Sequence, residues 1–173
     1  MPDKRPSENE YLAYYGSYID SVDDGHIVDT LRTNWETQKE MLEKMDESNL
    51  SFSYAEGKWT IAQLLMHMAD VERVMAYRAF CIARGEQISI PGFDHDAYVD
   101  AAPWQALSLD DLISDLDTLR RSTISLFSNF SPVQYDQIGK ANNAAVSVRA
   151  LAFIIAGHHN HHIKILKERY LSS

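Results

Sequence analysis

One stretch of the sequence repeats apolar side chains at the period of an α-helix. Between Leu109 and Phe130 they recur at alternating steps of three and four residues, which places them on one helical face. The members of this stripe are Leu109, Leu112, Leu116, Leu119, Thr123, Leu126 and Phe130. Ser108 and Asp111 supply the N-terminal signal, and Pro132 marks the end. The segment is therefore predicted to be an amphipathic helix that packs on a core.

Three further segments have helical length. One runs from about residue 27 to 45, and another begins at the capping box formed by Thr60 and Gln63 and ends near Gly85. The last begins after Ser147 and continues to about residue 170. No segment shows sustained strand alternation, and we predict no strand in residues 133–145, where Asn142-Asn143 leaves room for a short turn or hairpin. The sequence predicts one all-α domain.

The predicted domain covers residues 23–173 and follows an N-terminal extension, residues 1–22. Four tyrosines in that extension are available to pack on the bundle: Tyr11, Tyr14, Tyr15 and Tyr18. The longest connection, residues 87–107, carries Pro91, Gly92 and Pro103. A link of that length can cross the bundle, so the topology need not be simple up-and-down.

Charge and composition exclude several classes of function. The formal net charge is −9, which argues against binding to a nucleic-acid backbone. Cys81 is the sole cysteine, so neither an intramolecular disulfide nor a cysteine-rich zinc motif is expected. The first residues have no apolar run that would act as a signal peptide, and the run at 150–156 is too short to span a membrane. We expect a cytoplasmic protein with no membrane partner.

Four of the seven histidines lie within residues 158–162 of the last predicted helix. A helix turns about 100° per residue, so each can be placed relative to Ile155 at the centre of the apolar stripe. His162 falls about 20° from that centre, whereas His158 and His159 lie roughly 60° and 40° to either side. His161 lies about 120° away and is expected at the surface. Three of these imidazoles therefore face the core, where they need partners.

Histidines four residues apart on a helix stand one above the other and can reach one metal ion. The pairs His158/His162 and His159/His162 both point inward, and helical geometry does not choose between them. His67, at the edge of the apolar face of the second helix, would complete a three-nitrogen set. An open position on such a metal can take water or substrate. Asp70 lies one turn from His67 and would either orient it or remain a solvated surface charge.

Two other helical metal sites do not match the spacing. A carboxylate-bridged di-iron bundle uses Glu-x-x-His pairs, and no histidine here has a glutamate three residues before it. The His-Glu-x-x-His motif of zinc proteases is also missing from the sequence. The spacing therefore argues against a di-iron bundle and leaves a zinc protease of this type unsupported.

Several short motifs, in their order, resemble the DinB-like (DinB/YfiT) superfamily, whose members are regarded as metalloenzymes. They lie in residues 58–67, Glu72-Arg73, residues 91–99, residues 147–150, residues 157–162 and residues 168–170, and the resemblance spans about residues 27–171. It implies a four-helix bundle with an up-down-down-up course. It also implies a divalent metal (zinc, nickel or iron) on His67, His158 and His162, which selects His158 over His159, and a homodimer.

The segment Phe93-Asp94-His95-Asp96 also resembles the family sequence, although His95 departs from the more usual amide there. This loop would either cover the mouth of the metal site or cap a helix. Asp94 and His95, together with Asp70, are the candidates for a catalytic role.

Three functional hypotheses follow. The first is a metal-dependent enzyme, a thiol S-transferase or a hydrolase, in which the metal activates water or a low-molecular-weight thiol toward a small molecule. The second is a non-catalytic metal-binding bundle that acts as a stress- or damage-response interaction protein. Its metal would be closed by a fourth protein ligand such as Asp70, Asp94 or His95. The third is an interaction bundle without metal, in which the buried histidines bond to one another.

Overall fold

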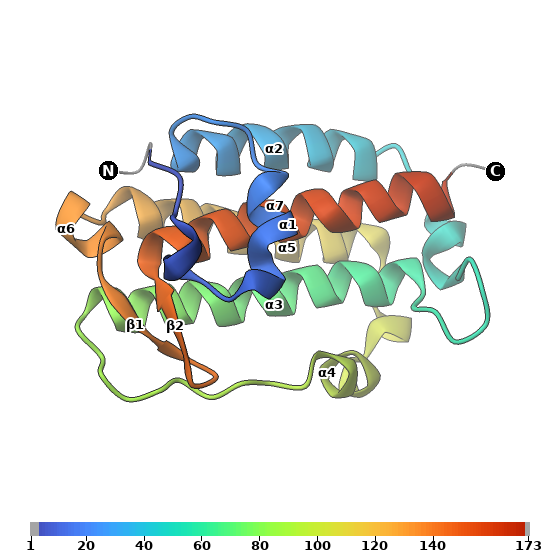
Figure 1. Cartoon of the computed structure of the whole chain (residues 1–173). Coiled ribbons are helices and arrows are strands. Elements are labelled where there is room, and N and C mark those ends of the chain that lie inside the picture. The colour runs from blue at the N-terminus through green and yellow to red at the C-terminus, as the bar shows by residue number, and fades with distance from the viewer. Residues whose placement is uncertain (1–3, 172–173) are drawn as a thin grey trace.

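The computed structural model describes residues 4–171 and is dominated by four long helices (Figure 1). These are α2 (Ile27–Leu42), α3 (Ile61–Ala83), α5 (Leu109–Ser128) and α7 (Val148–Ile165). Shorter elements are α1 (Gly16–Asp20), α4 (His95–Ala101), α6 (Pro132–Tyr135), β1 (Ile138–Ala141) and β2 (Ala144–Ser147), with a π-helical turn at Leu166–Tyr170 and 3-10 turns at Glu8–Glu10, Ala13–Tyr15, Glu47–Ser51 and Trp104–Ala106. The predicted four-helix bundle is confirmed.

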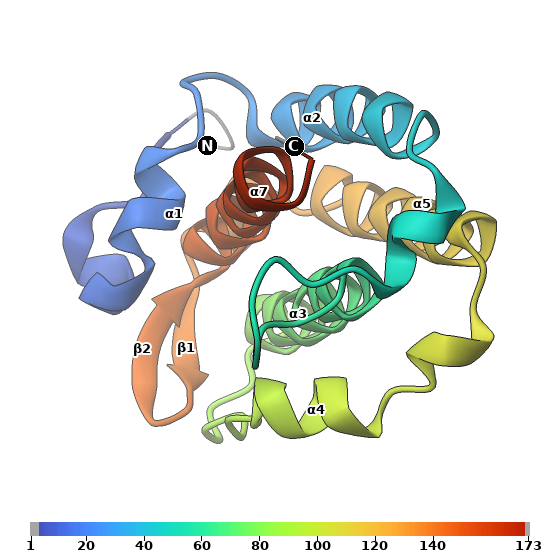
Figure 2. The same cartoon turned by 90° about the vertical axis from the view of Figure 1, so that its right-hand side faces the viewer.

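The course of the chain is up-down-down-up, as the resemblance implies. In Figure 1, α2 and α7 run in one direction and α3 and α5 in the other. Each of α3 and α2 contacts both α5 and α7, which leaves α2 and α3 at opposite corners of the bundle (Figure 2). Because α3 and α5 are parallel neighbours, the chain between them must return along the whole bundle. Residues 84–108 make this return, and they carry α4 on the way.

Side-chain caps fix where the long helices begin. Thr60 accepts a hydrogen bond from the Gln63 amide at 3.2 Å, and the Gln63 side chain accepts one from the Thr60 amide at 2.9 Å. Ser108 and Asp111 form the same reciprocal pair at the start of α5. These bonds satisfy amides that a helix leaves free in its first turn. The predicted role of Pro132 is wrong, because α5 already ends at Ser128 and Pro132 begins α6.

The segment that we predicted to contain no strand forms an antiparallel hairpin from β1 and β2. Asn142 and Asn143 make its two-residue turn with φ angles of 49° and 62°. Asparagine tolerates this left-handed region better than most residues, and two successive positive φ angles suit a tight hairpin. Each strand has four residues, too few for alternation to stand out in the sequence.

A layer of buried polar side chains divides the apolar core into two clusters along the bundle axis. One cluster uses the end of α7 up to Ala156, and the other begins at Ile163. The layer between them contains buried histidines of α7 and, from the neighbouring helices, Glu72 and Arg120. Burial of so many polar groups in one layer requires partners for them and points to the functional part of the molecule.

The N-terminal segment is packed on the bundle. Ile19 and Val22 are buried, and Arg5 donates hydrogen bonds to their carbonyl oxygens at 2.7 and 2.6 Å. At the N-terminal end of α7, the Ser147 hydroxyl donates a hydrogen bond to Glu10 at 2.7 Å. Residues 1–3 of the predicted extension and 172–173 of the predicted domain lie outside the described residues. Among residues 4–171, none of the helices has the length and apolarity that a bilayer crossing needs.

Helix α1 crosses α7 at Gly157. A Cβ atom at this position would lie 2.0 Å from the carbonyl oxygen of Tyr18, so no larger residue fits without moving the backbone of α1. This close approach explains a glycine inside a helix, where it costs about 1 kcal/mol relative to alanine. It also brings the Tyr18 ring beside His158, at 5.6 Å between centroids.

Candidate metal centre

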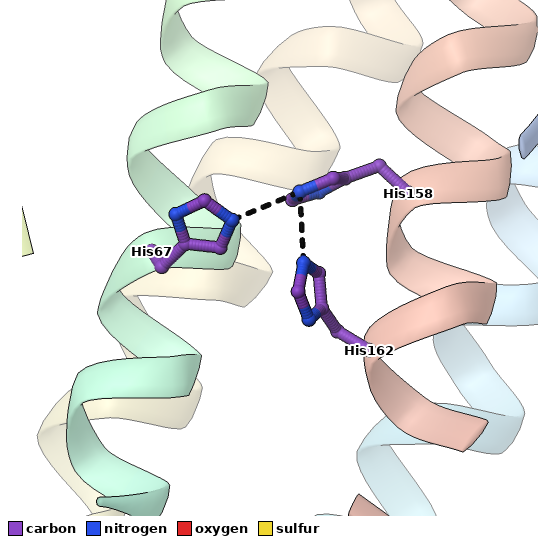
Figure 3. A group of neighbouring side chains, drawn as sticks. All are labelled: His67, His158 and His162. Atoms are coloured by element: carbon purple, nitrogen blue, oxygen red, sulfur yellow. Dashed lines mark hydrogen bonds between the residues drawn. The ribbon is translucent and has the colours of Figure 1, made fainter. Parts of the chain in front are cut away.

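Three histidine side chains from two helices converge in the polar layer. His67 comes from α3, and His158 and His162 come from successive turns of α7 (Figure 3). The Nε2 atom of His158 lies 3.1 Å from Nε2 of His67 and 3.0 Å from Nε2 of His162. All three side chains are buried. The structure thus brings together the three residues that the resemblance selects.

This arrangement suits a cation better than hydrogen bonds among the rings. Each imidazole Nε2 carries either one proton or one lone pair in the ring plane. Nε2 of His158 faces two other nitrogens, so it can form at most one good hydrogen bond between them. A divalent metal would accept all three lone pairs at once. Zinc–nitrogen bonds of about 2.0–2.1 Å place tetrahedral ligand nitrogens about 3.3 Å apart, close to the separations present here.

Packing rather than hydrogen bonding holds two of the rings from behind. The Nδ1 atoms of His158 and His162 are buried and have no hydrogen-bond partner among the described residues. The edge of Tyr18 packs on His158, and the Trp59 ring lies 4.6 Å from the His67 ring. The orientation of His158 and His67 therefore depends on these two aromatic side chains, whereas the His162 ring lies against the imidazoles of His67, His158 and His161.

The three histidines are neutral near pH 7. Burial, reinforced by the neighbouring imidazoles, lowers the pKa of His67 to about 4 and that of His162 to about 2. Burial and its two partners also hold the pKa of His158 well below the ordinary value. Neutral imidazole is the form that binds a metal, so the site is ready for an ion without first losing protons.

His159, the alternative that helical geometry left open, has a different partner. Its Nε2 atom lies 2.9 Å from Glu72, which also accepts two bonds of 2.9 Å from Arg120. Burial opposes the charged form of Glu72, but attraction to Arg120 and the bond from His159 outweigh it and lower the pKa of Glu72. Arg120 further donates to the Leu31 carbonyl at 3.0 Å. This buried network joins α2, α3, α5 and α7 behind the three-histidine cluster.

Of the other residues considered as ligands or catalytic groups, some lie near the site and others at the surface. His161 is exposed, as its position on the helix predicts. Asp70 lies 3.4 Å from Arg73, and Asp94 accepts bonds from the first amides of α4. His95 lines the cavity next to the cluster, with its ring 5.6 Å from that of His67. Of the three catalytic candidates, His95 therefore lies nearest to the site.

A cavity of about 420 Å³ opens onto the cluster. The N-terminal segment, the return connection and the hairpin turn contribute to its lining, together with α3 and α7. Besides the histidines, the lining includes Tyr15, Tyr18, Trp59, Val71, Met75, Arg78, Phe93 and Asn142. We did not predict a role for Arg78 from the sequence, although it lies eleven residues after His67. That spacing is three helical turns and places both side chains on one face of α3.

The chain is similar in sequence to two proteins of Oceanobacillus iheyensis, each named "putative metal-dependent hydrolase". One is 28% identical over 129 residues and covers 74% of both chains. The other is 23% identical over 149 residues and covers 81% of this chain and 86% of the relative.

Two solved structures share the fold. YfiT from Bacillus subtilis, described as a probable metal-dependent hydrolase with an unusual four-helix bundle topology, superposes with a TM-score of 0.74 at 18% identity. The match covers 96% of this chain and 91% of YfiT. A mycothiol-dependent maleylpyruvate isomerase gives 0.65 at 13% identity, over 79% of this chain and 58% of the isomerase. The sequence model of the DinB superfamily matches residues 30–166, so the chain belongs to the DinB superfamily.

Proposed function

We propose that the protein is a metal-dependent enzyme that binds a divalent transition metal through His67, His158 and His162 and acts on a small molecule by hydrolysis or group transfer. One observation carries this proposal: three neutral imidazoles converge at the wall of a cavity of about 420 Å³, with Nε2 of His158 lying 3.1 Å from Nε2 of His67 and 3.0 Å from Nε2 of His162. Imidazole suits zinc, nickel and iron alike, so each is a candidate for the native ion.

The chain's own residues would prepare the site for this chemistry. A metal with three protein ligands and an open position lowers the pKa of bound water or polarises a substrate. Trp59 and Tyr18 pack against the rings of His67 and His158. Beside the cluster, His95 is half exposed and has its ring 5.6 Å from that of His67, which makes it the candidate for contact with the substrate.

A catalytic site is favoured over a purely structural one. A structural metal is normally closed by a fourth protein ligand. Within residues 4–171, the buried group of candidate ligand atoms consists of the three histidines. Asp70 pairs with Arg73, Asp94 caps α4, and the exposed His95 lies outside the group formed by the three histidine nitrogens. The position toward the cavity is therefore free for water or substrate, which counts against the non-catalytic interaction bundle.

The names of similar proteins suggest two reaction classes. The Oceanobacillus relatives support hydrolysis, and the mycothiol-dependent isomerase supports a low-molecular-weight thiol as a second reactant. We further propose a cytoplasmic homodimer with no nucleic-acid partner, in keeping with the net charge of −9. The division into an extension, residues 1–22, and a bundle domain, residues 23–173, belongs to the same proposal.

Metal content tests the site directly. Untagged wild-type protein is expected to hold one equivalent of metal by elemental analysis, whereas His67→Ala and His162→Ala lose it. His161→Ala is the matched control, because it removes an exposed imidazole from the same helix turn as His162. Unchanged metal content in His67→Ala and His162→Ala would show that the site is wrongly assigned.

Activity is a separate test. Fully metal-loaded protein is assayed with thiol–electrophile pairs and with amide and ester substrates, and His162→Ala is expected to abolish any turnover found. If the loaded protein turns over none of these substrates, the non-catalytic alternative gains support.

A further inference from the structure

Arg78 is a buried cation without an acidic partner. It is 4% exposed, and no ion pair to its guanidinium occurs in the described part of the chain. Its Nη2 atom donates to the Pro91 carbonyl at 2.9 Å, Nη1 lies 3.5 Å from the sulfur of Met75, and Nε has no hydrogen-bond partner within residues 4–171. A guanidinium has five N–H donors, so several remain available. A buried charge without a counterion is costly, which calls for an explanation.

The guanidinium belongs to the same cavity as the three histidines. His67, Val71, Met75 and Arg78 form a stripe on one face of α3, and all four line the cavity. Eleven residues span about 16 Å along a helix axis. The contact with Met75 shows that the Arg78 side chain reaches back toward His67 by about one turn. Because the His67 side chain leans in the same direction, roughly 11 to 16 Å along the helix axis separates the guanidinium from the histidine cluster.

The surroundings of Arg78 leave its charge uncompensated. Arg78 donates a hydrogen bond to the Tyr15 hydroxyl, and burial raises the pKa of this phenol, which therefore stays neutral. Phe93 lies beneath the guanidinium, with 5.9 Å from Arg78 Cζ to the ring centroid. The exposed amide of Asn142 completes this end of the cavity. Neither aspartate nor glutamate lines the cavity among the residues that the structure describes. A positively charged, largely desolvated end facing a small cavity favours an anionic ligand group.

We propose that Arg78 binds a carboxylate of the substrate, and that the substrate is an elongated small molecule whose carboxylate lies at Arg78 while its reactive group lies at the histidine cluster. The reactive end of this assignment rests on the proposed function, whereas the carboxylate end rests on Arg78 itself. The planar guanidinium fork matches the two oxygens of a carboxylate, which a lysine would not reproduce.

A matched pair of bifunctional probes tests the proposal. Protein loaded with Co²⁺ is titrated with 6-mercaptohexanoate and with 6-mercaptohexanol, which share a thiol and a chain but differ in the terminal charge. The cobalt–thiolate absorption band reports binding of the thiol. Wild-type protein is expected to bind the acid about 10- to 100-fold more tightly than the alcohol, the range typical of hydrogen bonds to a charged group. Arg78→Gln, which keeps a donor for the Pro91 carbonyl, is expected to reduce this ratio to near one.

Two variants separate charge recognition from general effects. Arg78→Lys keeps the charge but loses the fork, so an intermediate ratio is expected. Arg73→Gln removes an exposed arginine of the same helix as Arg78, which pairs with Asp70 of α3 and Asp115 of α5, and it should retain the full wild-type ratio. Circular dichroism and cobalt uptake establish that each variant is folded.

The outcomes distinguish this inference from the proposed function. Equal binding of acid and alcohol by the wild type, or an unchanged ratio in folded Arg78→Gln, overturns the role of Arg78 and leaves the metal site standing. If the wild type takes up no cobalt, the proposed function fails, and calorimetry on the metal-free protein repeats the comparison. A preference for the acid that is lost in Arg78→Gln then supports the anion site alone, and equal binding overturns it.

Discussion

The contact between α1 and α7 makes Gly157→Ala a sensitive probe of the fold around the site. The added Cβ would lie 2.0 Å from the Tyr18 oxygen and 2.4 Å from its carbonyl carbon. Ordinary contact begins at 3.4 Å, so α1 must move by about 1.4 Å. Both atoms belong to the backbone, and no side-chain rotation can relieve the overlap. The variant is therefore expected to lift α1 from the bundle.

The size of the effect follows from two opposing contributions. Replacing a helical glycine by alanine stabilises by up to about 1 kcal/mol. Overpacking of a close contact costs about 1–3 kcal/mol. Gly16→Ala is the matched control, because this residue is also helical and an added Cβ meets nothing within 4 Å. We expect Gly157→Ala to be about 1–3 kcal/mol less stable than Gly16→Ala.

Urea unfolding of both variants measures this difference, and hydrogen exchange shows where it arises. In Gly157→Ala, the amides of residues 19–22 should exchange faster, because Arg5 holds the carbonyls of Ile19 and Val22 in this segment. The reasoning would be refuted if both alanine variants gained the same stability and exchanged alike. That result would mean that α1 does not rest on Gly157.

Two further predictions concern buried charge. Glu72→Gln leaves Arg120 without its counterion and should lower the free energy of unfolding, measured by urea denaturation, by about 3–5 kcal/mol. Asp115→Asn, which removes an exposed ion pair with Arg73, should change it by less than about 1 kcal/mol. Similar small losses in both would contradict the buried network. The second prediction concerns the metal-free protein. The pKa of His67 is an ordinary 6.5 in the unfolded chain and about 4 in the folded protein. Between these pH values the unfolded chain binds more protons, so the folded protein loses stability as the pH is lowered. From pH 7 to 5 this group should cost about 2 kcal/mol in urea unfolding with a chelator present, and an equal loss in His67→Gln would exclude His67 as the cause.

Much of the bundle could be predicted because its signals are local. The stripe from Leu109 onward and the box of Thr60 and Gln63 depend on neighbours within one or two turns, and both helices begin as predicted. The parallel pairing of α3 and α5 also left a local trace, a connection long enough to return along the bundle. The hairpin was missed because four-residue strands carry little periodicity, and their turn uses Asn-Asn in place of the commoner Asn-Gly.

The choice between His158 and His159 depends on α3, and no property of α7 reveals it. His67 and Glu72 are five residues apart on α3 and so point about 140° away from each other. His158 meets the first, and His159 meets the second. The two imidazoles differ by one residue in the chain but enter different environments. Arg78 was overlooked for the opposite reason: its spacing from His67 was visible, but its burial without a carboxylate was not.

The cavity is lined by two kinds of segment, which differ in how far their sequences can change without disturbing the fold. The three histidines stand on α3 and α7, whose other faces form the core, so substitutions there risk the whole bundle. Tyr18, Phe93 and Asn142 stand on the N-terminal segment, the return connection and the hairpin turn, which lie outside the four long helices. Exchanging these segments between relatives would alter what the cavity admits without replacing the two helices that carry the three histidines. Ile90 of the return connection is hydrogen-bonded to Lys140 and Asn142 of the hairpin, so these two segments would be grafted as a pair, and the N-terminal segment separately.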